Sequence, residues 1–254
     1  MRSVVRAGRC TLATALLALA AVSAFGADRN IRTISRYYTK PGQGQEFVDL
    51  ATKLVEIYKK AGVEHGWSLW QSQTGAPEYT VVRYYAKWAE LDQDDPKLKP
   101  VEAEIARLTS RISHCVDRIE RVADEVLPDQ SFGLSTQKEM PKYVRVLVTD
   151  VKPDRINDML EAIKTEVTPA YKKSGAALFL FSRTRFGGPT SQVRSVIGID
   201  GWTAFDGKLP LETVLGDAGY KALLQKLGSM TLNQEAFVYK YIPEGSYVPA
   251  GSGT

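Results

Sequence analysis

Apolar residues along the chain recur at a spacing of two in some stretches and of three to four in others, which predicts strands and helices respectively. Strand-like runs cover residues 31–39, 65–72, 79–85, 115–126, 143–149, 178–184, 193–199 and 236–242. Helical stripes lie between them, so that the order strand, helix, strand, strand, helix, strand occurs twice. The pattern predicts two β-α-β-β-α-β units over residues 28–132 and 142–247, a polar linker over 133–141 and a flexible tail over 248–254.

The helical stripes end where a glycine can take a left-handed conformation. The first stripe runs from Phe47 to Tyr58 and stops before Gly62, and its counterpart runs from Ile156 to Ala170 and stops before Gly175. Glycine is favoured directly after a helix. The second helix of each unit is marked by Val101, Ile105, Leu108 and Ile112, and by Tyr220, Leu223, Leu224, Leu227 and Met230. Each unit therefore has two amphipathic helices for one face of a four-stranded sheet.

A short segment recurs after the last strand of each unit. Leu127-Pro128-Asp129-Gln130-Ser131-Phe132 returns as Ile242-Pro243-Glu244-Gly245-Ser246-Tyr247, with the prolines 243 − 128 = 115 residues apart. Self-similarity at a fixed offset indicates an internal repeat. A proline ends strand pairing, so each tail is free to leave its own sheet. We expect Phe132 and Tyr247 to be buried against the opposite unit.

The sheet face that the helices leave bare carries apolar and aromatic residues as well, so it must be covered. The simplest cover is the sheet of the other unit, packed face to face. Further landmarks are the turn Lys40-Pro41-Gly42 and the segment Trp88-Ala89-Glu90-Leu91-Asp92, which is matched by Trp202-Thr203-Ala204-Phe205-Asp206. With the Gly62 helix end and the repeated tail, these resemble the dimeric α/β-barrel superfamily, above all its NIPSNAP and antibiotic-biosynthesis-monooxygenase branches.

The resemblance implies an α+β fold of two tandem ferredoxin-like units packed sheet to sheet as an intrachain pseudo-dimer. Whether such pseudo-dimers associate further is left open. Members of the superfamily include cofactor-free monooxygenases, isomerases and haem-binding or haem-degrading proteins, so the resemblance itself does not choose a function.

Charge changes the expected partners. The chain of 254 residues has 33 basic and 29 acidic side chains, but Arg2, Arg6 and Arg9 all lie in the first ten residues, where no acid occurs. Without the first 27 residues the net charge is 30 − 29 = +1. A nearly neutral protein lacks the broad positive surface that nucleic-acid binding requires, so no nucleic-acid partner is expected.

The N-terminus is typical of a signal peptide. A positive start precedes the apolar run of residues 11–22, which is too short to span a bilayer as a helix. We expect residues 1–27 to be removed by cleavage between Ala24 and Ala27, with export to the periplasm or the exterior and no membrane attachment afterwards. Cys115 is then the only cysteine of the mature chain, either a buried small hydrophobe or a free thiol.

Arginines and polar aromatic residues collect on the strands of the first unit. The candidate ligand-binding residues are Arg36, Tyr38, His65, Trp67, Arg83 and Tyr85. Aromatic walls with a few polar groups suit a small organic ligand, whose carboxylate or phenolate an arginine or tyrosine could orient. The second unit has Phe179, Phe181 and Ile197 instead, so if only one unit keeps a pocket, we expect it to be the first. The alternative is that these residues form sheet-to-sheet core with arginines at its edge.

Three functions are compatible with these residues. The first is binding of a small hydrophobic or aromatic molecule. The resemblance implies two others: a cofactor-free monooxygenase or isomerase-like enzyme with His65 and Tyr85 near the substrate, and a haem-binding or haem-degrading protein with His65 as axial ligand. His65 could equally be a hydrogen-bonded residue at a strand end. The sequence has no His, Asp and Glu pattern with metal-ligand spacing and no glycine-rich phosphate loop, so no metal site is expected and haem is the one cofactor considered.

Overall fold

The computed structural model describes residues 30–134 and 139–249. The first half contains β1 (Ile31–Thr39), α1 (Gly44–Ala61), β2 (Ser68–Ser72), β3 (Glu78–Tyr85), α2 (Glu102–His114) and β4 (Val116–Val126). The second contains β5 (Tyr143–Val151), α3 (Ile156–Ala162), α4 (Thr168–Lys173), β6 (Phe179–Phe186), β7 (Gln192–Ile199), α5 (Pro210–Met230) and β8 (Thr231–Tyr241). Both halves thus follow the predicted order. The predicted signal segment lies outside the described residues, so export stays a prediction.

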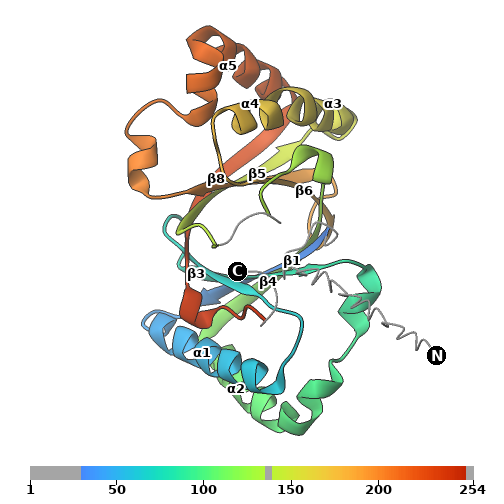
Figure 1. Ribbon diagram of the computed structural model, residues 1–254, viewed down its shortest axis with the longest axis vertical. Coiled ribbons are helices and arrows are strands. Elements are labelled where there is room, and N and C mark those ends of the chain that lie inside the picture. The colour runs from blue at the N-terminus through green and yellow to red at the C-terminus, as the bar shows by residue number, and fades with distance from the viewer. Residues whose placement is uncertain (1–29, 135–138, 250–254) are drawn as a thin grey trace, which may run out of the picture.

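The eight strands form one closed antiparallel barrel in the order β1-β3-β2-β8-β5-β7-β6-β4. Helices α1 and α2 cover it at one end of the molecule and α3 to α5 at the other, with the barrel between them (Figure 1). The sequence predicted two separate sheets packed face to face. The structure instead joins their edges, β2 to β8 and β4 to β6, because closure leaves no strand edge unpaired.

The two seams between the halves are short, and the repeated tails lengthen them. Pairing of β2 with β8 covers three residue pairs, and that of β4 with β6 covers four with a bulge. Beyond them Tyr247 bridges to Trp67 and Phe132 bridges to Phe179. Ser246 Oγ accepts a hydrogen bond from the Leu69 amide at 2.8 Å, and Ser131 Oγ accepts one from the Phe181 amide at 2.9 Å.

Both tails therefore lie against the opposite half, as predicted. Tyr247 is buried, with 2% of its surface exposed, whereas Phe132 is half-buried. The hydrogen bonds of Ser131 and Ser246 are equivalent in the two halves.

The two helical layers differ in how well they fill the space above the sheet. In the first half Phe47, Leu50 and Leu69 are fully buried, and Phe47 stacks on Tyr79 with ring centroids 4.8 Å apart. In the second half α3 passes through a π-helical turn, Ile163–Val167, into α4, and α5 is kinked at Gly216, where φ is 69°. Irregular helices of this kind often mark functional regions.

Several boundaries differ from the sequence prediction. Strand β2 begins at Ser68 rather than at residue 65, and α5 begins at Pro210, ahead of the predicted stripe. Cys115 follows α2 instead of lying in a strand, and it is buried, which agrees with the first of the two alternatives given for it. No helix among the described residues combines the length and the apolar character needed to cross a membrane.

Gly133, next to the first tail, is expected not to tolerate a side chain. Its φ is +93°, and a Cβ there would lie 2.1 Å from the carbonyl oxygen of Ala177. A non-glycine residue at positive φ costs about 1–2 kcal/mol, and the contact with backbone adds to this. Gly133→Ala should therefore lower the free energy of unfolding by about 2 kcal/mol or more in urea titrations. Gly201→Ala is the control, because a Cβ at Gly201 meets no atom within 4 Å; equal losses in both variants would contradict the prediction.

Candidate functional site

The barrel strands present alternate residues to two different spaces. In β5, Val144, Val146 and Val148 face the lumen, whereas Arg145, Leu147 and Thr149 face the helices. A cavity of about 180 Å³ lies in the lumen, and one of about 200 Å³ lies between α3 to α5 and the sheet of the second half. An apolar cavity of ~150 Å³ can hold a benzene molecule, so each space admits a small ligand.

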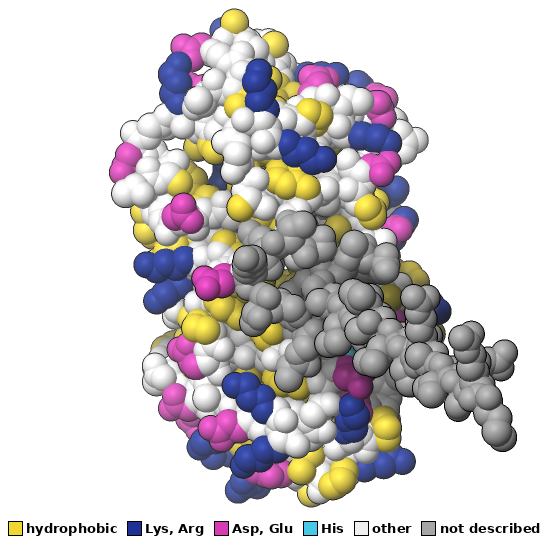
Figure 2. Space-filling model, viewed as in Figure 1, with side chains coloured by type: hydrophobic (Ala, Val, Ile, Leu, Met, Phe, Trp, Pro, Cys, Tyr) yellow, Lys and Arg dark blue, Asp and Glu magenta, His cyan; other side chains and the backbone are white. Residues whose placement is uncertain are grey.

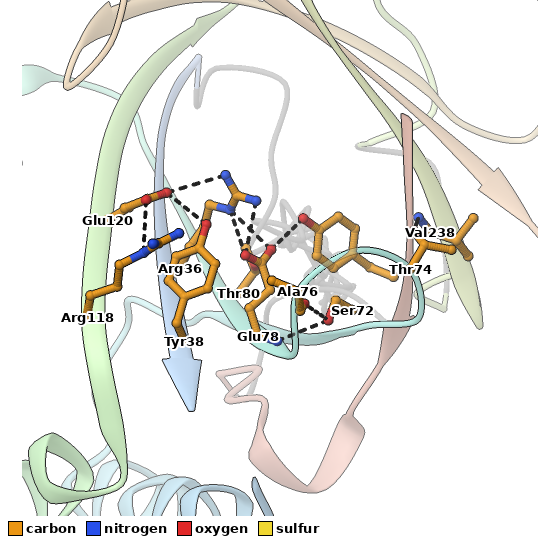
Figure 3. Close-up of polar contacts among 11 residues, drawn as sticks. Arg36, Tyr38, Ser72, Thr74, Ala76, Glu78, Thr80, Arg118, Glu120 and Val238 are labelled. Carbon is orange, nitrogen blue, oxygen red and sulfur yellow. Dashed lines mark hydrogen bonds and ion pairs between the residues drawn. The ribbon is translucent and has the colours of Figure 1, made fainter. Parts of the chain in front are cut away.

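Arg36 and Glu78 form a polar group on one side of the lumen (Figure 3). Arg36 Nε donates to both carboxylate oxygens of Glu78, at 3.0 and 3.1 Å, and the Tyr239 hydroxyl donates to Glu78 Oε1 at 2.6 Å. Burial lowers the pKa of Arg36, but the neighbouring Tyr239 and Glu78 raise it overall. The charges of Arg36 and Glu78 therefore compensate each other. The Glu78 side chain is only 2% exposed, and its carboxylate also accepts a hydrogen bond from a phenol of the other half.

The hairpin between β2 and β3 fixes the position of Glu78. The Glu78 amide donates to Ser72 Oγ at 3.0 Å, and Ser72 Oγ donates to the Ala76 carbonyl at 2.8 Å. Thr74 Oγ1 in the same turn accepts a hydrogen bond at 3.0 Å from the amide of Val238 in β8 (Figure 3). The carboxylate is therefore positioned by side chains that tie both halves together.

Tyr38 lies next to this group. Its hydroxyl donates to Glu120 at 2.9 Å, and the guanidinium of Arg118 lies 3.9 Å from its ring centroid. Burial raises the pKa of Tyr38 to about 12, with Glu120 acting in the same direction and Arg118 opposing it. Tyr38 is therefore a hydrogen-bond donor at neutral pH and cannot act as a base there.

A second polar group surrounds Asp124, which is completely buried. Its carboxylate accepts from Arg32 Nη2 at 3.0 Å, from Arg194 Nη1 at 2.8 Å and from Ser182 Oγ at 2.9 Å. Burial raises the pKa of Asp124, but the two guanidinium groups lower it overall. One carboxylate thus faces two buried cations. Arg32 Nε is buried and has no hydrogen-bond partner in the described part of the chain.

The cavity under α3 to α5 has apolar walls with a few polar groups. The polar residues in its lining include Arg145, Tyr171 and Tyr220. Gln234 and Thr149 line it as well, and Gln234 donates a hydrogen bond of 2.9 Å to Thr149 Oγ1. Burial raises the pKa of Tyr171 to about 12, although Arg145 opposes this. Arg145 forms no ion pair with any described residue. Asp, Glu, His, Lys and Cys do not occur among the described residues of this lining.

The structure divides the six predicted site residues into separate places. Arg36 lines the lumen and Tyr38 joins its polar group, but His65, Trp67, Arg83 and Tyr85 line neither cavity. His65 is exposed, with its ring centroid 6.1 Å from that of Tyr85, and the guanidinium of Arg83 lies 5.2 Å from the Trp67 ring. Trp67 is buried against Tyr247, so it belongs to the tail contact.

The helix-to-sheet cavity also lies in the second half, whereas the sequence pointed to the first. The large side chains Phe47 and Tyr79 fill the corresponding space of the first half.

Sequence reasoning missed most of the residues that line the two cavities. Those in the lumen are Arg32, Arg194 and Tyr239, and those under the helices are Arg145, Tyr171 and Tyr220. The buried carboxylates of Asp124 and Glu78, which bond to Arg32 and Tyr239, were missed as well. One signal was present: Asp124 alternates with Val122 and Val126, which puts a charge between two apolar residues on one face of the strand. A charge in such a position indicates a buried partner or a site.

No protein-family model matches the sequence, and neither does any curated protein. Solved structures do match in fold. A candidate monooxygenase of Lactobacillus acidophilus superposes with a TM-score of 0.60 at 11% identity, over 89% of this chain and 97% of that one. A candidate monooxygenase of Fusobacterium nucleatum gives 0.61 at 12%, over 87% and 94%. An anthrone oxidase-like protein gives 0.58 at 15%, over 91% and 97%.

The chain has the dimeric α/β-barrel fold. At 11–15% identity the likeness extends to the fold alone. The chemistry therefore has to be argued from the residues of this chain.

The residues present do not fit a histidine-ligated haem. The two histidines of the sequence, His65 and His114, are both exposed and line neither cavity. His114 Nδ1 lies 2.7 Å from the carbonyl oxygen of Ser110 on its own helix. The described residues also contain no cluster of three or more His, Cys, Asp or Glu side chains that could hold a metal ion.

Proposed function

We propose that the protein binds a small aromatic molecule with an acidic group in the cavity under α3 to α5. The observation that carries this is the guanidinium of Arg145, which has no ion-pair partner among the described residues and lies beside the phenols of Tyr171 and Tyr220 in a cavity with otherwise mostly apolar walls. A partly buried cation without an ion pair favours an anionic ligand, and arginine and tyrosine hydrogen bonds can orient a carboxylate or phenolate. The walls suit an aromatic body, since Phe179 and Phe181 contribute to them.

Binding is placed ahead of catalysis because the described lining offers no base for neutral pH. General base catalysis needs a group whose pKa lies near the working pH. The pKa of Tyr171, raised to about 12, keeps its hydroxyl protonated. The alternative, a cofactor-free oxygenase or isomerase, is motivated by the fold of the candidate monooxygenases and requires a proton acceptor that this lining lacks.

We further propose that the chain is an internal duplication that forms its own pseudo-dimer, related to the NIPSNAP and antibiotic-biosynthesis-monooxygenase branches and exported after cleavage of its signal segment. The shared element order and the equivalent Ser131 and Ser246 hydrogen bonds support the duplication. The near-neutral charge of the remaining chain fits the face of the molecule in Figure 2, where basic and acidic side chains are interspersed. The second half would then keep a cavity between its helices and its sheet, while side chains fill the corresponding space in the first half.

The test uses 1-naphthoate as probe, with naphthalene as its neutral counterpart, in calorimetry and methyl-labelled NMR. We expect 1-naphthoate to shift the methyl signals of Leu147, Val193 and Leu223, which line the cavity. Arg145→Gln should weaken its binding about tenfold or more, since a hydrogen bond to a charged group contributes about 1.5–3 kcal/mol. Naphthalene binding should change little.

Lys221→Gln is the matched control, because it removes the same charge from an exposed position on α5. This variant should bind 1-naphthoate like the wild type. Equal affinity of Arg145→Gln and wild type for 1-naphthoate, or shifts confined to other methyl groups, would refute the proposed site.

A further inference from the structure

We propose that the barrel lumen is a second ligand site, separate from the cavity under α3 to α5, and that it takes a small monocarboxylate with an apolar body. The lumen cavity of about 180 Å³ is walled by aliphatic side chains that include Ile34, Val82, Val122, Val146, Leu180 and Val196. These come from six different strands, three in each half. The inference does not depend on the function proposed above.

The charge inside the barrel is not balanced. Arg32 and Arg194, 3% and 9% exposed, share the single carboxylate of Asp124. On the other side of the lumen Arg36 is matched by Glu78. Arg118 and Glu120, whose side chains are 62% and 44% exposed, pair with each other at the surface and do not enter this balance. One buried positive charge is therefore in excess among these groups. Because an uncompensated buried charge is costly, a monoanion in the lumen would be stabilised.

A buried donor is also left over. Arg32 Nη2 already donates to Asp124 and Ser182, but its Nε has no partner in the described part of the chain. Guanidinium groups have five N–H donors and bind carboxylates through them. Asp124 thus holds the two arginines in place, and the carboxylate of a ligand would accept from the donor that remains.

The residues that lie between the two polar groups of the lumen favour a ligand with an apolar body. Arg32 and Arg36 lie on the same face of β1, four residues apart, which corresponds to about 13 Å along a strand. Ile34 lies between them, paired with Val82 and Val122 on the neighbouring strands. If the carboxylate of a ligand binds at Arg32 and Arg194, the rest of that ligand lies among aliphatic side chains. A small anion without an apolar part is therefore not the preferred ligand.

The two cavities can be blocked independently. Val196 of β7 faces the lumen, whereas its neighbour Ser195 faces the helices. A phenylalanine at either position fills one cavity from the same strand and leaves the other unchanged. Arg194→Gln removes the excess charge while it keeps Asp124 paired with Arg32, so this variant is expected to fold.

The experiment titrates octanoate, with 1-octanol as the neutral counterpart, into methyl-labelled protein. Octanoate should shift the methyl signals of Val82, Val122 and Val196, and 1-octanol should bind at least about tenfold more weakly. Arg194→Gln should weaken octanoate binding by a similar factor, and Val196→Phe should abolish it. Ser195→Phe should leave octanoate binding unchanged.

Several results would overturn the inference. These are octanoate shifts confined to the cavity under the helices, unchanged affinity in Arg194→Gln, or loss of octanoate binding in Ser195→Phe. Should Val196→Phe fail to fold, Arg194→Gln and Ser195→Phe decide the question. Titration of 1-naphthoate on the same samples separates the two proposals. If 1-naphthoate binds under the helices but octanoate leaves the lumen methyl signals unchanged, only the present inference is refuted; if octanoate binds in the lumen but 1-naphthoate leaves the methyl signals under the helices unchanged, only the function proposed above is refuted.

Discussion

Asp124→Asn is expected to lower the free energy of unfolding by about 3–5 kcal/mol, although it preserves the size of the side chain. The carboxylate is completely buried and is the acid that compensates Arg32 and Arg194. An amide supplies no negative charge, so two cations would remain buried without compensation. Urea titration at neutral pH measures the loss.

The same carboxylate predicts a pH dependence with a defined sign. Because the folded-state pKa of Asp124 is depressed, its contribution to stability is present above the unfolded pKa of about 3.9 and is lost as the pH falls through the lower folded value. The difference in unfolding free energy between wild type and Asp124→Asn should therefore be constant near neutrality and narrow below about pH 4. A difference that grows on acidification would show that the depressed pKa is wrong.

Asp129→Asn is the control for this pair of measurements. Asp129 forms a 2.6 Å ion pair with Lys164, but both side chains are largely exposed. Exposed pairs contribute about 0–1 kcal/mol, so this variant should stay close to wild type. Comparable losses from Asp129→Asn and Asp124→Asn would contradict the role assigned to the buried group.

The order of strands and helices could be predicted from the sequence because it depends on local signals. Apolar periodicity, the left-handed glycine Gly62 after α1 and the prolines of the two tails each act within a few residues. The burial of Tyr247 on the opposite half followed from the repeat together with strand-ending proline. These parts of the fold needed no knowledge of long-range packing.

Barrel closure and the place of the cavities could not be predicted in this way. Closure depends on which edge strands meet, and only three residue pairs join β2 to β8. The cavity in the second half depends on a π-helical turn and a kinked α5, neither of which has a periodic signature. The predicted residues His65 and Tyr85 lie on the first half, where Phe47 and Tyr79 already fill the space between the helices and the sheet.

The polar residues of the lumen divide unequally between the halves. Asp124 of β4 and Tyr239 of β8 occupy equivalent positions in the register, opposite Arg32 and Val144 respectively. The first half thus supplies the buried acid and the second supplies a phenol. Two halves of one chain, unlike two identical chains, can differ in this way. The buried acid and its two arginines therefore occur on one side of the lumen only, and a ligand would place its acidic group there.

Tyr247→Ala is expected to lower the free energy of unfolding by about 3–5 kcal/mol, the usual cost of removing a large buried aromatic side chain. The ring is 2% exposed and packs on Trp67, with centroids 5.3 Å apart. Its hydroxyl donates to the Val63 carbonyl at 2.6 Å. Since the seam between β2 and β8 is short, the loss should also open it. Hydrogen exchange at the Leu69 and Trp67 amides, which bond to Ser246 and to Tyr247, should therefore accelerate.

Two further variants separate the ring from its hydroxyl and from its position. Tyr247→Phe keeps the ring and removes one hydrogen bond, so it should cost only about 1 kcal/mol. Val248→Ala changes the next residue, which is 41% exposed, and should cost less than about 0.5 kcal/mol. If Tyr247→Ala proved no worse than Val248→Ala, the tail would contribute nothing to closure, and the short β2–β8 seam would have to hold by its own backbone hydrogen bonds.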